Sequence, residues 1–224
     1  MKLRDQILWE LRQIETYLED GCDTIAGHNG LYHDEETPVR NLSHWLFLVS
    51  ECKLRHDDYK IESQFIDNLK QRILDCLLKD EFRPLNQAFW VRKNPKKDFC
   101  NGTIGQAWVI EALVRASIAF AEPGLYKIAE DLFCKHPFHD DLGVWGRLNV
   151  DGTHSTPDPV FNHQLWMAAA ASQLDKTDLA RQRASLFLDN VASNVKLYHD
   201  GIICHLSPVM KMPHKSSDKR LKVE

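Results

Sequence analysis

An aspartate and a histidine stand five residues apart at the start of an apolar segment. Asp158 lies in the sequence TPDPVFNHQLW, between two prolines, and His163 follows in the same run. The prolines restrict the backbone and stiffen the segment that presents Asp158. A carboxyl group beside an imidazole can supply the acid and base that glycoside hydrolysis, or epimerisation next to a carbonyl, requires. We predict both as catalytic residues; the alternatives are a turn-forming Asp and a capping His.

Further acidic residues lie in the long segments between the predicted helices: Asp34, Asp98, Asp140 and Asp141. Of these, we predict that Asp141 contacts the substrate. The sequence HPFHDD places His136 and His139 just before this pair of aspartates. Its proline, and the absence of a helical i, i+4 histidine pair, favour an exposed polar loop over a metal site. We predict no metal and no other cofactor.

Tryptophans are candidates for sugar contacts, because a pyranose ring presents C–H groups that can lie against an aromatic face. Trp90 and Trp145 lie in predicted loops, where they can contact a ligand or anchor the loop. Trp108 and Trp166 each begin an apolar helix, where core packing is an equal alternative. We predict that Trp90, Trp108 and Trp145 contact the sugar. Neighbouring polar residues complete the predicted substrate site: Asn101, Gln106 and Asn162.

Seven helices are predicted to position these residues, from apolar spacing of three and four. Their expected ranges are Leu3–Glu19, a helix capped by Ser43, Tyr59–Leu78, Gly105–Phe120, Gly124–Cys134, His163–Leu174 and Asp178–Val195. Strand signals are weak and lie in the loops, in the runs AFWV, GVWGRL and GIICHL. None of the six cysteines forms a C-x-x-C pair, so we expect reduced core residues.

An internal repeat is the strongest organisational signal. Trp45, Trp108 and Trp166 recur about 60 residues apart, each just inside an apolar helix that follows a long loop. A hairpin of two helices cannot bury its own apolar face and must stack on its neighbours. Long and short connections alternate, so all long loops should lie at one end of the stack. The sequence therefore predicts an all-α fold of stacked helical hairpins with one polar mouth.

These motifs resemble those of the six-hairpin glycosidase-like (α/α) toroids. The run Gly105–Trp108 (GQAW) resembles a motif of unsaturated glucuronyl hydrolases, in which an Arg precedes the Gly and lines the sugar site with the Trp; here that place holds Ile104. Asn101-Gly102 resembles the Asn-Gly pair of rhamnogalacturonyl hydrolases. The run Asn162–Trp166 (NHQLW) is similar to the helix starts of N-acylglucosamine 2-epimerases.

The resemblance implies a carbohydrate-active protein, glycoside hydrolase-like or sugar epimerase-like, that acts on a glycan or on a uronic or amino sugar. One departure concerns the hairpin that we align with Val39–Trp45. The hydrolases carry a catalytic Asp there, whereas this chain has Arg40 and Asn41. The alternative is a non-catalytic degenerate toroid, or a helical-repeat partner in polysaccharide assembly. Fold analogy does not decide between these functions.

Length and net charge limit the possible architecture of the chain and its possible partners. The 224 residues, 43% of them hydrophobic, suit one repeat domain over residues 1–205 and a polar tail over 206–224. That is about three to three and a half hairpins of a ring of six, so we expect self-association or a missing C-terminal portion that completes the toroid. A net charge of −4 argues against nucleic-acid binding. No apolar run is long enough to cross a membrane, and the charged start is no signal peptide, so we expect a cytoplasmic protein.

Overall fold

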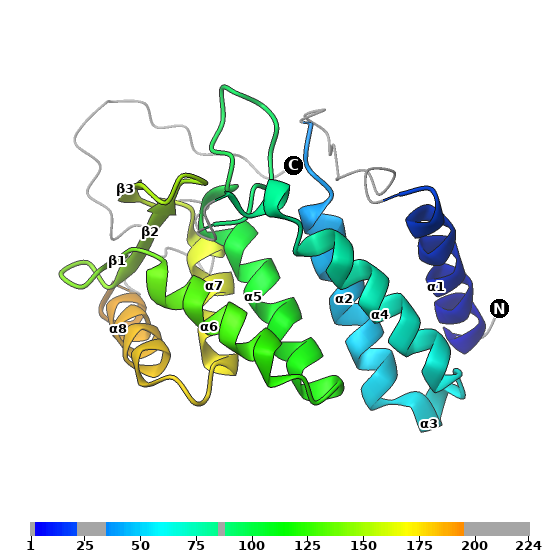
Figure 1. The fold of residues 1–224 in the computed structure, drawn as a ribbon. Coiled ribbons are helices and arrows are strands. Elements are labelled where there is room, and N and C mark those ends of the chain that lie inside the picture. Colours follow the sequence, from blue (N-terminus) through cyan, green and yellow to red (C-terminus); the bar gives the residue numbers. More distant parts are fainter. Residues whose placement is uncertain (1–2, 22–34, 85–87, 195–224) are drawn as a thin grey trace, which may run out of the picture.

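The computed structural model describes residues 3–21, 35–84 and 88–194 (Figure 1). The elements in this part of the chain are α1 (Leu3–Glu19), α2 (Val39–Leu54), α3 (His56–Tyr59), α4 (Ser63–Leu77), the 3-10 helix η3 (Asp80–Phe82), α5 (Gly102–Ala119), α6 (Pro123–Lys135), β1 (Phe138–His139), β2 (Val144–Leu148), β3 (His154–Pro157), α7 (Phe161–Gln173) and α8 (Asp178–Asn194). Asp34, the run GIICHL and the predicted tail lie outside the described residues.

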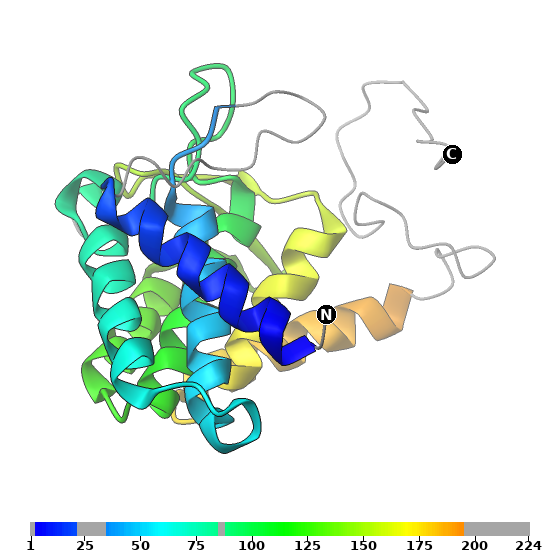
Figure 2. The same ribbon diagram turned by 90° about the vertical axis from the view of Figure 1, so that its right-hand side faces the viewer.

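The helices form two layers. Helix α5 lies between α2 and α7, and these three make up the inner layer; α4 packs against α2 and α6 packs against α5, in the outer layer. Helix α1 contacts α4 at one end of the array, and α8 contacts α6, α7 and β2 at the other (Figures 1 and 2). One hydrophobic cluster runs through helices from α1 to α8. The predicted all-α stack of helical hairpins is therefore confirmed. No described helix has the length and apolar character that a membrane span requires.

The described parts of the segments that precede α2, α5 and α7 lie at one end of the inner layer. Helices α2, α5 and α7 all begin at that end, and the short connections after α2, α5 and α7 lie at the other (Figure 1). The segment before α7 folds into a small antiparallel sheet of order β1-β2-β3, with Phe138 opposite Trp145 and Gly146 opposite Pro157. Strand β2 lies within the predicted run GVWGRL. The run AFWV forms no strand, but Arg92, just after it, makes an isolated bridge with Glu36.

Helix α5 is buried on almost every side. Between Gly102 and Ser117, only Glu111 and Arg115 are not buried, and Ile118 continues their line. The steps of four and three residues place these side chains on one face of the helix. Apart from Gln106, the buried side chains on the other faces are small or apolar, because α2, α6, α7 and β2 contact this helix. The stripe that begins at Glu111 is therefore the part of α5 that faces away from the core.

Helix starts are where the sequence prediction errs. Helix α2 begins at Val39, after Pro38, and not at Ser43. Ser43 is buried inside the helix, where its hydroxyl donates to the Val39 carbonyl at 2.8 Å. A serine can satisfy its hydroxyl in this way one turn back, so a good capping residue need not mark a helix start. Helix α5 begins three residues earlier than predicted, and α7 two residues earlier.

The cysteines are mostly as expected. Cys52, Cys100 and Cys134 are free, and the first two are buried. Burial raises the pKa of Cys52 to about 11 and also raises that of Cys100, so neither is a thiolate nucleophile at neutral pH. Cys76 is buried as predicted, but it is disulfide-bonded, which corrects the expectation of a reduced thiol. Helical spacing predicts burial and says nothing of covalent pairing.

Gly105 allows α5 to pack closely on the chain that precedes it. A Cβ atom there would lie 2.1 Å from the Cys100 carbonyl oxygen, which is part of the backbone. We expect Gly105→Ala to lower the free energy of unfolding by about 2 kcal/mol, because the helix must move to make room. Denaturant unfolding measures this, with Gly124→Ala as control, since a Cβ at Gly124 meets nothing within 4 Å. Equal stability of the two variants would contradict the close packing.

Candidate active site on the inner helices

The structure brings Asp158 and His163 into direct contact. Asp158 is 1% exposed, and its Oδ2 lies 2.8 Å from His163 Nδ1. The same oxygen accepts the backbone N–H of Thr103 at 2.7 Å, and Oδ1 accepts that of Val160 at 3.0 Å. Asp158 therefore links the start of α7, which carries His163, to the start of α5. Both oxygens of this carboxylate are occupied by protein groups.

These contacts keep Asp158 ionised. Burial acts to raise its pKa, but the hydrogen bond from His163, the charge of that ring when it is protonated, and the N–H groups of Thr103 and Val160 act more strongly together, and the pKa lies below its ordinary value. A carboxylate accepts the Nδ1–H of a neutral imidazole, which leaves the lone pair on Nε2. The His163 side chain is 19% exposed. Nε2 of His163 has no hydrogen-bond partner among the described residues, so it is the atom of the pair that can reach a ligand.

The first turn of α5 packs directly on this pair. Asn101 and Gly102 both have left-handed backbone conformations, with φ of 57° and 61°. A Cβ atom at Gly102 would lie 2.4 Å from Asp158 Oδ2 and 2.7 Å from His163 Nδ1. Only glycine therefore suits this position in both conformation and space. Asn101, a predicted substrate contact, is 5% exposed at this turn, so the pair Asn101-Gly102 lies against Asp158 and His163 through its glycine.

Asp98 is a second carboxylate at the start of α5, and it has no histidine partner in the part of the chain that the structure describes. It accepts the backbone N–H of Cys100 at 2.8 Å and that of Gly102 at 2.5 Å. This is an Asx turn, and it matches the bond from Val160 to Asp158 in the next repeat. The structure therefore places Asp98 as a cap of α5.

Gln106 is fully buried and bonds to the backbone. Its Oε1 accepts the N–H of Phe89 at 2.8 Å, and its Nε2 donates to the carbonyls of Phe89 at 3.0 Å and Cys100 at 3.4 Å. The carboxamide thus forms hydrogen bonds with the backbone of the segment before α5, as a neighbouring β-strand would. Its polar atoms, which we predicted to contact substrate, are occupied by these groups.

Gln164 does the same one repeat later, and the sequence prediction missed it. Its Oε1 accepts the N–H of Trp145 at 2.8 Å, and its Nε2 donates to the carbonyls of Trp145 at 2.7 Å and Asp158 at 2.8 Å. Both glutamines stand two residues before the repeated tryptophan, so the repeat itself held the signal. Because Gln164 bonds to the Asp158 carbonyl, it fixes the segment that presents the carboxylate.

Five side chains from the three inner helices make up what we call the inner-face cluster: Arg40, His44, Trp108, Glu111 and Trp166. The Arg40 guanidinium lies 4.6 Å from the centre of the Trp108 ring, and the His44 ring lies 5.4 Å from it. Trp166 meets Trp108 edge-on at 6.2 Å and donates its Nε1–H to Glu111 at 3.0 Å. Trp108 is 6% exposed, with its Nε1 unpartnered among the described residues.

The sequence prediction included only Trp108 of this cluster. Pairs at i, i+3 or i, i+4 share one helix face, and such pairs run from Arg40 to His44, from Trp108 to Glu111 and from His163 to Trp166. The last pair places His163 and the cluster on the same side of α7. His44 is exposed, and partial burial followed by the charge of Arg40 lowers its pKa, against the opposing effect of Glu111. The lowered pKa of His44 favours the neutral imidazole, which can accept a proton or donate an N–H hydrogen bond.

Two tryptophans that we predicted to contact the sugar, Trp145 and Trp90, pack or form hydrogen bonds within the protein. Trp145 is 0% exposed and packs among Phe133, Phe138 and Phe187, so no face of its ring is accessible to a sugar. Trp90 is half-buried and donates its Nε1–H to the Arg92 carbonyl, within its own loop. Both rings hold loop segments in place.

The predicted polar contacts Asn162 and Asp141 lie at different places. Asn162 is exposed in the first turn of α7, next to His163 in the chain. Asp141 is exposed in the turn between β1 and β2, which packs on α8: a Cβ atom at Gly143 would lie 2.8 Å from the Leu186 carbonyl. The structure therefore places Asn162 on the helix of the candidate site, and Asp141 beside α8.

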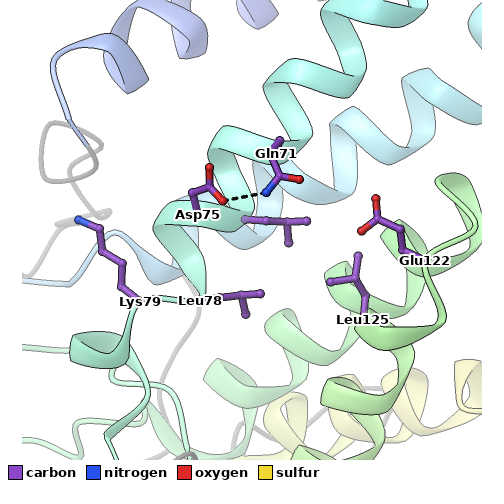
Figure 3. Close-up of a pocket in the computed structure, with 7 residues that line it drawn as sticks. Gln71, Asp75, Leu78, Lys79, Glu122 and Leu125 are labelled. Atoms are coloured by element: carbon purple, nitrogen blue, oxygen red, sulfur yellow. Dashed lines mark hydrogen bonds between the residues drawn. The ribbon is translucent and has the colours of Figure 1, made fainter.

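A cavity of about 410 Å³ lies in the outer layer, between α4 and α6 (Figure 3). Its lining residues are Gln71, Leu74, Asp75, Leu78, Lys79, Glu122 and Leu125. Gln71 and Asp75 bond to each other at 2.8 Å. No residue of the inner-face cluster lines it, so we place no function there.

His136 is buried in the sheet region. Its Nε2 donates to the Gly146 carbonyl at 2.8 Å, and burial lowers its pKa from 6.5 to about 4. Among the described residues, no group of three His, Cys, Asp or Glu side chains could hold a metal ion.

The lowered pKa of His136 predicts loss of stability in mild acid. Below pH 6.5 the unfolded chain binds a proton at this residue and the folded chain does not, so the free energy of unfolding falls as the pH falls towards 4. The slope is about 1.4 kcal/mol per pH unit, and the total is about 3 kcal/mol. Urea unfolding at a series of pH values measures it. His136→Gln should remove this component over the same range; an unchanged slope would contradict the assignment.

The chain is similar to known proteins in sequence and in fold. No protein-family model matches it. It is 42% identical over 190 residues to the archaeal glycosylation protein Q of Haloferax volcanii, in an alignment that covers 84% of this chain and 50% of that protein. The chain thus spans about half the length of the curated relative it matches.

Among solved structures, the chain resembles D-mannose isomerase with a TM-score of 0.60 and 15% sequence identity, over 90% of this chain and 55% of the isomerase chain. At that identity the likeness concerns the fold alone. The chain therefore has an (α/α) toroid-like fold of helical hairpins, with a sequence similar to half of an archaeal glycosylation protein.

Proposed function

We propose that the inner-face cluster and His163 bind a sugar, and that the Asp158–His163 pair transfers a proton in a sugar isomerase or epimerase reaction. The observation that carries the proposal is the contact of the buried carboxylate with Nδ1 of His163, which leaves Nε2 available. The relative named for glycosylation and the fold likeness to an isomerase of D-mannose support a carbohydrate ligand.

The proposed reaction begins at the lone pair on Nε2 of His163. Nε2 of His163 removes the proton from the carbon next to the sugar carbonyl, and the electron pair of that C–H bond forms a carbon–carbon double bond as the carbonyl oxygen becomes an enediolate. For an aldose, the neighbouring hydroxyl gives its proton to the former carbonyl oxygen, and return of the removed proton to the former carbonyl carbon gives the isomeric ketose. If the enediolate instead turns its opposite face to His163, return of the proton to the original carbon gives the epimer. We assign to the His44 side chain, which lies against Trp108, an N–H hydrogen bond to the enediolate oxygen.

The carboxylates near the site favour this reaction over glycoside hydrolysis. A glycosidase uses one carboxyl group as acid and a second as nucleophile or base. Both oxygens of Asp158 accept hydrogen bonds from protein groups. Glu111 accepts bonds from Trp166 at 3.0 Å and Gln173 at 3.3 Å. A histidine base requires neither carboxylate to be free.

The test is a panel of aldoses, ketoses, uronic acids and N-acetylamino sugars. A sugar that binds only the folded protein raises the midpoint of thermal unfolding. We expect one sugar class to do so, and that sugar to take up deuterium from D₂O at the carbon next to its carbonyl, by NMR. His163→Ala should abolish deuterium uptake. If no sugar shifts the midpoint or exchanges, the proposal is wrong, and a non-catalytic helical-repeat protein is favoured.

A further inference from the structure

Trp166 is an aromatic side chain held open to solvent on the inner layer. It is 39% exposed, which leaves on the order of 100 Å² of its surface uncovered. Its Nε1 donates to Glu111 Oε2 at 3.0 Å, and Glu111 Oε1 accepts from Gln173 Nε2 at 3.3 Å. Trp108 stands against it at an interplanar angle of 88°. The ring is therefore fixed in orientation and yet not buried.

Its place along α7 relates this surface to His163. Residues at i and i+3 lie on one helix face, about one turn or 5 Å apart along the axis. A ring lying on Trp166 therefore brings its carbon atoms within reach of the imidazole of His163. A carboxylate has about four lone pairs, and Glu111 uses two of them for its hydrogen bonds with Trp166 and Gln173. Glu111 can therefore also accept hydrogen bonds from sugar hydroxyls at the edge of the indole.

We infer that Trp166 is the platform on which the pyranose ring of the substrate stacks before the ring opens. The inference rests on the proposed function and adds the class of ligand, a pyranose with C–H groups on one face. Trp108 supports the platform from the side, and Glu111 positions it by holding Nε1. The partial exposure of Trp166 matches this use, because a stacked ring needs an accessible face in a fixed direction.

The experiment compares three variants, by calorimetric titration with D-mannose, D-glucose, D-glucuronate and N-acetyl-D-glucosamine. For the sugar that binds the wild-type chain, we expect Trp166→Ala to weaken Kd by 10- to 100-fold and Trp166→Phe to weaken it less than 5-fold. Trp9→Ala is the matched control, because Trp9 is also exposed, at 54%, but lies on α1. It should leave Kd unchanged. At sugar concentrations below Kd, deuterium uptake by Trp166→Ala should fall in step with the weakened binding.

The outcomes separate this inference from the proposed function. If none of the sugars binds the wild-type chain or undergoes exchange, both fail. If a sugar binds and exchanges, but Trp166→Ala binds it as tightly as Trp9→Ala does, the platform alone is wrong, and the exposed ring is then a contact for a protein surface. The thermal midpoint without sugar shows that each variant is folded.

Discussion

Asp158→Asn is expected to lower the rate of sugar deuterium exchange by about 10²- to 10⁴-fold while the chain stays folded. An amide cannot accept hydrogen bonds on both sides, as the carboxylate does from Thr103, Val160 and His163. If its NH₂ faces His163, Nδ1 becomes the acceptor and the proton moves to Nε2, which then cannot act as a base. Loss of the correct tautomer in a comparable Asp–His pair has an effect of this size.

The matched control is Asp98→Asn, which likewise removes a carboxylate that accepts a backbone N–H in the first turn of α5, but Asp98 contacts no histidine among the described residues. Both variants should lose about 1–2 kcal/mol of unfolding free energy, because a backbone N–H loses its acceptor. Only Asp158→Asn should lose exchange activity and change the ¹⁵N NMR signature of the His163 tautomer. Equal activity of the two variants would contradict the role of Asp158.

Gln164→Leu is expected to lower the free energy of unfolding by about 3 kcal/mol or more. The change leaves the Trp145 N–H and the Asp158 carbonyl without the partner that the carboxamide supplies. The Trp145 carbonyl loses one of two donors and keeps the Asp158 N–H at 3.0 Å. Each unsatisfied buried group costs about 1–3 kcal/mol. Gln106→Leu should have a similar effect, since the bonds from Gln106 to Phe89 repeat the pattern.

The control for the glutamine prediction is Gln71→Leu. Gln71 is exposed on α4, and its bond to Asp75 can be replaced by water. We expect a change within about 0.5 kcal/mol in denaturant unfolding. If Gln164→Leu were as stable as Gln71→Leu, the buried glutamine would not hold the segment before α7.

The sequence prediction succeeds for contacts between residues close in the sequence and fails for contacts between distant segments. Asp158 and His163 lie five residues apart at a helix start, so a local reading of one segment is enough to pair them. The inner-face cluster depends instead on how α2, α5 and α7 are rotated against one another. Helix α5 is apolar on nearly every side, so its pattern does not say which face each neighbour covers. Only the line of Glu111, Arg115 and Ile118 holds that information.

Two other residues show why a residue type alone misleads. Gln106 is polar and stands at the start of a helix, which suggests a ligand contact, yet the segment at Phe89 has no strand partner and takes the carboxamide instead. Trp145 lies in a loop by sequence, yet Phe133 from α6 and Phe187 from α8 enclose it. These partners are about 12 to 42 residues away, beyond the reach of a local pattern.

The hydrogen bonds of Gln106 affect how the sequence of this chain can change during evolution. One side chain holds both ends of a surface loop, because it bonds to Phe89 where the loop leaves and to Cys100 where it returns. The stretch between them, around Lys93–Lys97, can thus lengthen or shorten without moving α5. Doubling a flexible loop costs only about 0.6 kcal/mol. The loop between Phe89 and Cys100 can therefore be replaced by a different loop while the helices stay the same. Such a replacement can change the ligand preference of the chain.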